Sequence, residues 1–304
     1  MKKIFFTVIS LLIIIFIAIT LLKHGEPEVS LKSSDIKKTE GEKENIRRFW
    51  QIYRKATENR IAGKPEKAAL EYEQALNIDN QHEDAWYYLG NVYLELNKFE
   101  SAKQAWQHLV RINPNSSRAH FQLGDLYLSI NHQELFDIDS AEQEFKKTLD
   151  INKEESAPTL RLGQIALIRN HLPDAKNLFE AVMKSNFKSI EAHFLDGYIA
   201  WKTGQSQKAS DLLVQAAQLT AVSEPTPPVG NNHDTNVVQA PGISQRSEHQ
   251  SIFKKYYNDL SGLDRSRLLQ EQNERYQQLN VFLEHIRKVS EDNTTMQKKS
   301  GQIP

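Results

Sequence analysis

The sequence predicts an all-α fold, in which an α-solenoid of about five helix-turn-helix units follows one transmembrane helix and precedes a linker and C-terminal helices. Three observations support this prediction. An apolar stretch near the start is long enough to cross a bilayer. A pattern of small and large residues then recurs about every 34 residues, which is the period of a stacked helical repeat. A segment rich in proline and asparagine follows, and apolar residues at helical spacing resume after it.

The N-terminal segment 1–24 is predicted to be an uncleaved signal-anchor helix. Residues 4–22 are apolar except for two threonines and one serine. At about 1.5 Å per residue, a helix over this stretch is roughly 28 Å long, close to the hydrocarbon thickness of a bilayer. A cleavable signal peptide has a shorter apolar core and a cleavage site of small residues, whereas the nearest candidate, 18–20, is followed by leucines.

Basic residues on both sides of the span leave two orientations open. Lys2 and Lys3 favour a cytoplasmic N-terminus, which would export the rest of the chain, whereas Lys23, Lys32 and the lysines at 37–38 favour the opposite. Because a short basic start before an apolar stretch resembles a bacterial signal-anchor, we expect a single-pass protein of the inner (cytoplasmic) membrane with an extracytoplasmic repeat domain. Residues 25–44 are too polar to fold alone and are predicted to be a tether.

Composition excludes several classes of protein. The chain has 38 Lys+Arg and 39 Asp+Glu, and no basic stripe, so nucleic acid is not an expected partner. It has no cysteine, which excludes disulfides, thiolate zinc sites, a cysteine nucleophile and a lipid-modified cysteine.

One segment carries a specific repeat signature. Residues 86–93 read Trp-Tyr-Tyr-Leu-Gly-Asn-Val-Tyr, and Ala102, Trp106 and Pro114 follow. This resembles the tetratricopeptide-repeat (TPR) signature, W-x2-L-G-x2-Y with a later alanine, aromatic residue and proline. The array is predicted over 45–223, with units at about 49–82, 83–116, 117–155, 156–189 and 190–223. The resemblance implies a right-handed superhelix whose first helices line a concave groove that binds other proteins.

Each unit repeats the residue types that a close helix crossing needs. Two helices approach closely only where side chains are small, and a large side chain one turn along fills the space beside them. The small residues are Ala56, Gly90, Gly124, Gly163 and Gly197, the second-helix alanines are Ala68, Ala102, Ala141, Ala175 and Ala209, and the large residues are Tyr72, Trp106, Phe145, Phe179 and Leu213. The turn holds Gly63, Asn97, Asn131, Asn170 and Gly204, types that tolerate the left-handed end of a helix.

The pattern also departs from the family in places. The closing proline occurs only at Pro114, and the first unit has Lys55 and Asn59 where leucine and tyrosine are expected. The third unit carries extra residues around 132–139. The sequence Ser-Ala-Glu-Gln at 140–143 then predicts a capping box at the start of its second helix.

Aromatic, amide and charged side chains are expected to line the groove. Interface energy concentrates on buried aromatic anchors, so such a lining suits an amphipathic or hydrophobic peptide or helix. Packing between neighbouring helices is the alternative use of the same aromatic side chains. The candidate residues are Tyr53, Tyr87, Asn91, Phe121, Asp125, Leu160, Arg161, Gln164, Phe194 and Tyr198.

The C-terminal third is predicted to hold a disordered linker over 224–248, a helical segment over 249–290 and a disordered tail over 291–304. Within the helical segment, a short helix is expected over 250–260, and a longer one from Asp264 to about Val289. The longer helix carries an apolar stripe of Leu269, Tyr276, Leu279, Leu283 and Ile286. It could cap the last repeat, lie in the chain's own groove or pair with another chain. We expect one of the first two, because solenoid ends need covering.

No pattern indicates an enzyme. His120 and His193 stand where Trp86 packs in the second unit, which favours a structural role. Asp137 and Asp139 resemble the start of a calcium loop but lack its glycine and spaced carboxylates. We therefore expect no metal and no cofactor. The expected function is a membrane-anchored scaffold for protein–protein interaction, of an envelope-assembly or secretion/pilus type. The alternatives are a cytoplasm-facing scaffold that recruits soluble enzymes and, more remotely, an enzyme.

Overall fold

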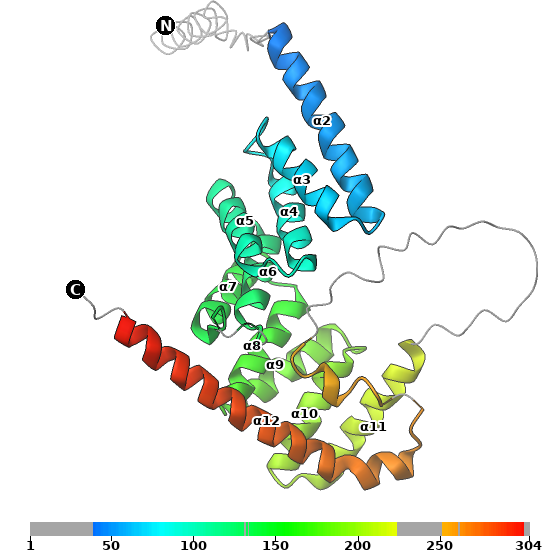
Figure 1. Ribbon diagram of the computed structural model, residues 1–304. Helices are drawn as coiled ribbons and strands as arrows, with labels where there is room; N and C mark the ends of the chain where they lie inside the picture. The colour runs from blue at the N-terminus through cyan, green and yellow to red at the C-terminus, as the bar shows by residue number, and fades with distance from the viewer. Residues whose placement is uncertain (1–38, 131, 133, 224–250, 261, 301–304) are drawn as a thin grey trace, which may run out of the picture. The chain divides into compact units, whose positions relative to one another are not determined.

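The computed structural model describes residues 39–130, 132, 134–223, 251–260 and 262–300 (Figure 1). The chain divides into two compact units, 1–46 and 47–304. The predicted anchor and the predicted linker over 224–248 lie outside the described residues, as does most of the predicted tether. Within the described ranges, no helix combines the length and the apolar character that a membrane span requires.

The described part of the first unit is Thr39 and the first turns of α2 (Glu40–Ile61). The Thr39 hydroxyl accepts from the Glu42 N–H at 3.2 Å, and the Glu42 carboxylate accepts from the Thr39 N–H at 2.6 Å. This reciprocal pair is a capping box. The predicted tether over 25–44 is therefore too long at its C-terminal end, because the helix already begins at Glu40.

In the second unit, every regular element among the described residues is a helix, and short turns connect most of the helices. Figure 1 shows them following one another as antiparallel hairpins. Their bounds are α3 Pro65–Leu76, α4 Glu83–Glu95, α5 Phe99–Ile112, α6 Ser117–Tyr127, α7 Ile138–Ile151, α8 Ser156–Ile168, α9 Leu172–Ser185, α10 Ile190–Lys202, α11 Ser206–Ser223, the short 3-10 helix η1 Lys254–Tyr256 and α12 Arg265–Ser300. The fold is thus an all-helical solenoid of TPR-like hairpins, as the sequence predicts at this level.

Glycine allows the two helices of a hairpin to approach closely. A Cβ atom added at Gly124 would lie 2.7 Å from the ring of Phe145, and one at Gly163 would lie 2.6 Å from the ring of Phe179. Gly90 lies as close to the indole of Trp106. These aromatic rings are fully buried, so each hairpin has its own small apolar core.

Left-handed residues end the first helix of four hairpins. Gly63 and Gly204 have φ of 65° and 77°, and Asn97 and Asn170 have φ of 56° and 62°. The sequence prediction for these turns is confirmed, since glycine and asparagine are the residues that adopt this conformation most readily. Asn131, the equivalent residue of the third hairpin, lies outside the described residues.

The start of α7 differs from its prediction. The helix begins at Ile138, and Asp137 caps it, because one carboxylate oxygen accepts from the N–H groups of Asp139 and Ser140 at 3.0 Å each. The predicted capping box at 140–143 is therefore wrong by one turn. In the sequence, Asp137 resembles the first ligand of a calcium loop. In the structure, its carboxylate caps the N-terminus of α7 instead.

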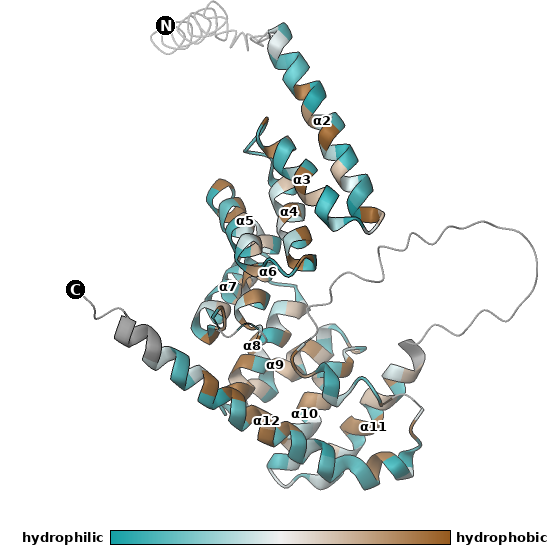
Figure 2. Ribbon diagram, in the orientation of Figure 1, coloured by the Kyte–Doolittle hydropathy of each residue, from teal (hydrophilic) through white to brown (hydrophobic). Residues whose placement is uncertain are grey.

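The C-terminal segment packs on the last repeats. The predicted helix over 250–260 is reduced to the single turn η1, while α12 begins one residue after its cap, Asp264, as predicted. Leu279, Leu283 and Ile286 are fully buried in a cluster that includes residues of α8 and α10. Hydrophobic residues of α12 gather in the middle of the helix in Figure 2. Of the predicted stripe, only Leu269 is exposed, and Leu268 is buried in its place.

The far end of α12 corrects another boundary. The helix continues to Ser300, whereas a disordered tail was predicted from residue 291. Asn293 donates from its side chain to the carbonyl oxygen of Phe136 at 3.2 Å, which ties this part of α12 to the loop before α7. A contact between residues so far apart in sequence leaves no local signal.

Candidate peptide-binding groove

The ten candidate residues lie on the first helices of the five hairpins. Tyr53 is on α2, Tyr87 and Asn91 are on α4, Phe121 and Asp125 are on α6, Leu160, Arg161 and Gln164 are on α8, and Phe194 and Tyr198 are on α10. The structure divides them into two sets. An open section on α2, α4 and α6 leaves its aromatic side chains partly exposed, whereas a covered section on α8 and α10 lies beneath the C-terminal segment.

Aromatic rings crowd the start of the open section. Tyr53 is half-buried, and its ring centre lies 5.0 Å from that of His82 and 5.7 Å from that of Tyr72. Trp50 stands 49% exposed at 5.7 Å from Tyr53 in an edge-on arrangement. Burial raises the pKa of Tyr53 to about 12, with smaller contributions from Tyr72 and Asp84. The hydroxyl is therefore a neutral hydrogen-bonding group at physiological pH.

Tyr87, Asn91 and Phe121 continue the open section. The guanidinium of Arg118 lies over the Tyr87 ring, 4.5 Å from its centre, and is also paired with Asp84. The side-chain oxygen of Asn91 is buried and has no hydrogen-bond partner among the described residues. The Phe121 ring packs edge-on against Phe145 at 5.6 Å and keeps part of its surface exposed. Both uses considered from the sequence, inter-helix packing and groove lining, are thus combined in these side chains.

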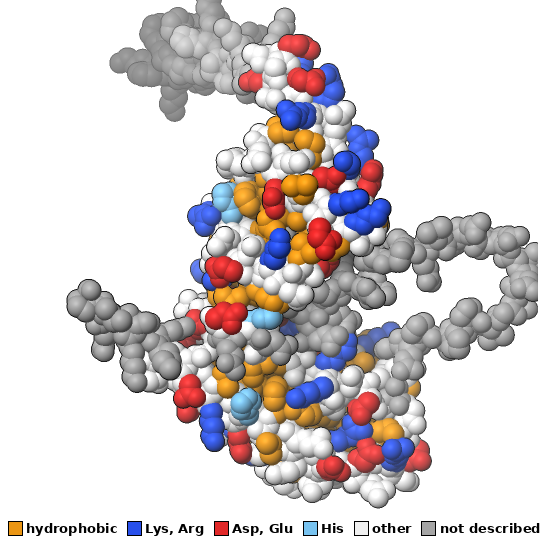
Figure 3. Space-filling model, in the orientation of Figure 1, with side chains coloured by type: hydrophobic (Ala, Val, Ile, Leu, Met, Phe, Trp, Pro, Cys, Tyr) orange, Lys and Arg blue, Asp and Glu red, His pale blue; other side chains and the backbone are white. Residues whose placement is uncertain are grey.

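Apolar surface is visible in this part of the array. On the face shown in Figure 3, hydrophobic side chains gather over helices α3 to α5. Two of these helices, α3 and α5, are second helices of their hairpins, so this surface is not the row of candidate residues on the first helices.

The covered section differs from its prediction. Phe194 and Tyr198 are 0% and 1% exposed, because the C-terminal segment lies on them. The Phe194 ring contacts those of Tyr257 and Tyr276 at 5.8 and 5.4 Å, and the Tyr198 hydroxyl donates to the side-chain oxygen of Asn280 at 2.9 Å. Their expected exposure in a groove is wrong for this state of the chain. Leu160 is half-buried and packs against the same cluster.

A buried polar cluster joins α6, α8 and α10. Arg161 donates from Nε to Asp125 at 2.7 Å, and its NH1 lies 3.8 Å from the Glu191 carboxylate. Gln164 donates to Glu191 at 2.6 Å and to the Ser251 hydroxyl at 3.2 Å. Asp125, Arg161 and Gln164 are predicted groove residues, and the structure brings them together in this buried cluster.

Burial and neighbouring charges shift the pKa values of Arg161 and Glu191 in opposite directions. Burial raises the pKa of the Glu191 carboxyl, although Arg161 and the Ser251 hydroxyl oppose the shift. Burial also disfavours the charge of Arg161, but Asp125 and Glu191 outweigh it and raise its pKa. Arg161 therefore stays charged and bridges Asp125 and Glu191, one on each neighbouring first helix.

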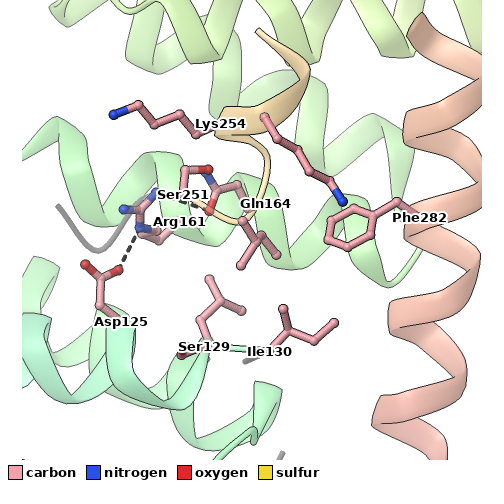
Figure 4. Close-up of a pocket in the computed structure, with 11 residues that line it drawn as sticks. Asp125, Ser129, Ile130, Arg161, Gln164, Ser251, Lys254 and Phe282 are labelled. Atoms are coloured by element: carbon pink, nitrogen blue, oxygen red, sulfur yellow. Dashed lines mark hydrogen bonds and ion pairs between the residues drawn. The ribbon is translucent and has the colours of Figure 1, made fainter. Parts of the chain in front are cut away.

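A small cavity of about 260 Å³ lies beside this cluster. Figure 4 shows Arg161 pointing toward Asp125, with Ser251 next to Gln164 and Phe282 of α12 on the opposite side. Ser129, Ile130 and Lys254 complete the labelled lining. The cavity marks the seam where the C-terminal segment meets the repeats.

Sequence reasoning missed the roles of three residues of the covered section. Glu191 and Ser251 complete the polar cluster, and Tyr276 fills the space above Gly197. The apolar stripe predicted for α12 includes Tyr276 and was the available signal. The spacing of its residues does not show which surface the stripe packs against. Glu191 stands at the start of α10, where an acidic residue is ordinary, and so gave no signal.

The comparisons with known proteins agree with this architecture. The family model described as "Tetratricopeptide repeat" matches residues 60–131. "Protein bimA" of Emericella nidulans is 36% identical over 52 residues, which are 17% of this chain and only 6% of that protein's length. "MamA 41-end from Desulfovibrio magneticus RS-1" gives a TM-score of 0.50 at 14% identity, covering 60% of this chain and 98% of that one. A second crystal structure of MamA protein gives 0.50 at 16% identity, covering 61% and 98%.

The structural likeness concerns the fold alone, because the identities are low. The chain is thus similar in fold to these all-helical solenoids, and its residues 60–131 match the tetratricopeptide-repeat family model. Repeats of this class bind other proteins or peptides.

Proposed function

We propose that this protein is a scaffold that holds a peptide or helix of another protein in the open section of its groove. The observation that carries the proposal is the row of half-buried aromatic side chains on three successive first helices, Tyr53, Tyr87 and Phe121. Each can add an apolar anchor for a partner, and such anchors are often worth about 2 kcal/mol or more.

A double variant tests this function. Tyr87→Ala with Phe121→Ala removes two neighbouring anchors and is expected to reduce partner recovery at least tenfold, by the estimate of about 2 kcal/mol per anchor. The matched control is Phe187→Ala, since Phe187 is 69% exposed in the α9–α10 turn, which carries none of the candidate residues. Recovery is measured by pull-down with the full chain in detergent. Equal recovery with the double variant and the control would reject the groove as the binding site.

The proposal includes a membrane anchor at 1–24 and an extracytoplasmic repeat domain. Its support is the apolar stretch 4–22 after Lys2 and Lys3. Envelope assembly or a secretion/pilus-type process is the setting that this placement favours. A C-terminal reporter fusion distinguishes the alternative: alkaline phosphatase activity is expected here, whereas green fluorescence without it would indicate a cytoplasm-facing scaffold that recruits soluble enzymes.

A binding role, rather than a catalytic one, is part of the same proposal. The histidines at 120 and 193 are both engaged with nearby carboxylate or carbonyl oxygens. No cluster that could hold a metal occurs among the residues that the structure describes. An activity that persists after Tyr87 and Phe121 are replaced would favour an enzyme instead.

A further inference from the structure

The last repeats hold a helix of this chain. Tyr276 of α12 contacts three aromatic residues of α10, with ring centres 5.4 Å from Phe194, 6.0 Å from Tyr198 and 5.9 Å from Trp201. The helix α12 also contacts α8 and α11. Since Phe194 and Tyr198 are groove positions of the array, α12 occupies a place that a partner would otherwise take.

Tyr276 fills a position that the fifth hairpin leaves empty. In the second, third and fourth hairpins, the glycine of the first helix faces an aromatic ring of the second helix. The fifth hairpin has Leu213 at that place, and a Cβ at Gly197 would meet the hydroxyl of Tyr276 instead. The fifth hairpin is therefore completed by an aromatic side chain from outside the repeat.

Further contacts of α12 follow one face of the helix. Leu279, Leu283 and Ile286 are fully buried, at spacings of three and four residues. Arg287 donates to the carbonyl oxygens of Leu167 and Ile168 at the C-terminal end of α8, where a positive charge is favoured. The site therefore selects a helix, because an extended peptide would not place these groups together.

The fit of α12 is incomplete. The Tyr276 hydroxyl is buried and has no hydrogen-bond partner among the described residues. The carboxylate of Asp196, the residue before Gly197, is also buried. Its ion pair with Lys208 at 3.0 Å offsets the cost of that burial. A buried polar atom without a partner costs free energy, so an aromatic side chain without a hydroxyl would fit this position better.

We propose that repeats four and five form a second binding site, distinct from the open section, for an amphipathic helix of a partner protein. That helix carries phenylalanine at the place of Tyr276 and aliphatic residues at the places of Leu279, Leu283 and Ile286. In the free protein α12 fills the site, and the partner helix displaces it. The proposal rests on the scaffold function given above and names a partner class for its covered section.

Labelled peptides of residues 265–295 test the site. One peptide has the native sequence, a second carries Tyr276→Phe, and a third carries Leu283→Asp as the matched control. The host is the full chain in detergent, either native or opened by Leu279→Asp with Leu283→Asp in its own α12. Fluorescence anisotropy gives the dissociation constants. We expect the opened chain to bind the native peptide at least about tenfold more tightly than the native chain does, because the site is no longer filled.

The phenylalanine peptide is expected to bind the opened chain about tenfold more tightly than the native peptide, since it buries no unpaired hydroxyl. The Leu283→Asp peptide is expected not to bind. Equal affinity of the native and opened chains, or of the tyrosine and phenylalanine peptides, would overturn the proposal.

A second variant pair keeps the test independent of the opened chain's folding. Gly197→Ala places a methyl group against the Tyr276 hydroxyl, so hydrogen exchange of α12 is expected to speed up in the full chain. Adding Tyr276→Phe removes the clash and is expected to restore protection. Protection that stays lost in the double variant would overturn the assignment of Tyr276 to this position.

One further experiment distinguishes the two binding sites. Tyr87→Ala with Phe121→Ala, introduced into the opened chain, is expected to leave peptide affinity unchanged. Loss of affinity would assign the peptide to the open section and overturn the second site. Unchanged affinity supports the second site whatever the same variant does to partner recovery.

Discussion

One buried histidine shows how hydrogen bonds allow a polar ring to take the place of an aromatic residue in a repeat. His120 stands where Trp86 packs in the second hairpin, and it is 6% exposed. Its Nδ1 lies 2.6 Å from the Glu144 carboxylate and its Nε2 lies 3.0 Å from the carbonyl oxygen of Pro114. Two acceptors around one ring favour the doubly protonated form. The hydrogen bond to Glu144 is the main cause that raises the pKa of His120 above its ordinary value of 6.5.

This arrangement predicts a pH dependence of stability. Because the folded pKa of His120 is raised, its contribution is complete below the unfolded value of 6.5 and is lost as pH rises through the folded value. We expect the urea midpoint of the native chain to fall over this range, and that of Glu144→Gln to fall less. Circular dichroism at pH values from about 5.5 to 8.5 measures both. Parallel curves would show that this pair does not titrate with folding.

The close approach of Gly90 to Trp106 predicts how strongly one added methyl group destabilises the chain. Gly90→Ala directs a Cβ into the indole of Trp106, which is fully buried, and is expected to destabilise the chain by about 1–3 kcal/mol. Adding Trp106→Phe should recover part of that loss by reducing the ring volume. Gly41→Ala is the matched control, because nothing lies within 4 Å of its Cβ and alanine favours the helix. Denaturant unfolding measures all three, and an unaffected Gly90→Ala chain would contradict the close approach.

Residue-level predictions from the sequence succeeded where the cause is local. Asn97 and Gly63 adopt the left-handed conformation because the turn itself requires it. Groove residues depend on what covers them, and the sequence does not record this. Tyr198 bonds to Asn280, 82 positions away, so its burial could not be read from the repeat that contains it.

At the scale of elements, the sequence predicts the existence of a helix better than its ends. Helix existence follows from the repeated spacing of apolar residues, so the hairpins were predictable. Boundaries depend on which of several competing caps is used. Ser140 begins an acceptable capping sequence, yet Asp137 lies one turn earlier, and its two oxygens bond both backbone N–H groups and the Ser140 hydroxyl. The stronger cap therefore sets the start of α7.

Removal of this cap is expected to weaken the third hairpin. Asp137→Ala leaves two N–H groups at the start of α7 without their acceptor and should cost about 1 kcal/mol, whereas Asp137→Asn should cost much less. Asp150→Ala, in the exposed last turn of the same helix, is the control and should stay within about 0.5 kcal/mol. Urea denaturation distinguishes them. Equal values for Asp137→Ala and Asp150→Ala would show that the cap does not limit stability.

At the scale of the whole molecule, the repeats differ in how they are completed. A solenoid is stabilised by contacts between neighbouring units, and its last unit has a neighbour on one side only. Here α12 and the turn at η1 cover that end, with Phe253, Tyr276 and Leu283 buried against the repeats. The second hairpin instead has hairpins on both sides and does not depend on the C-terminal segment.

Deletion of residues 251–304 should therefore destabilise the array unevenly. Phe194 and Tyr198 lose their cover, so amides of α10 and α11 are expected to exchange at least about tenfold faster, because local opening costs less there. Amides of α4 and α5 should keep their protection, since contacts in a solenoid reach only the adjacent units. Hydrogen-exchange mass spectrometry of the full and shortened chains measures both regions. An equal loss in α4 and α5 would mean that the array opens as one cooperative unit, and unchanged exchange in α10 would mean that α12 adds no stability to the repeats beneath it.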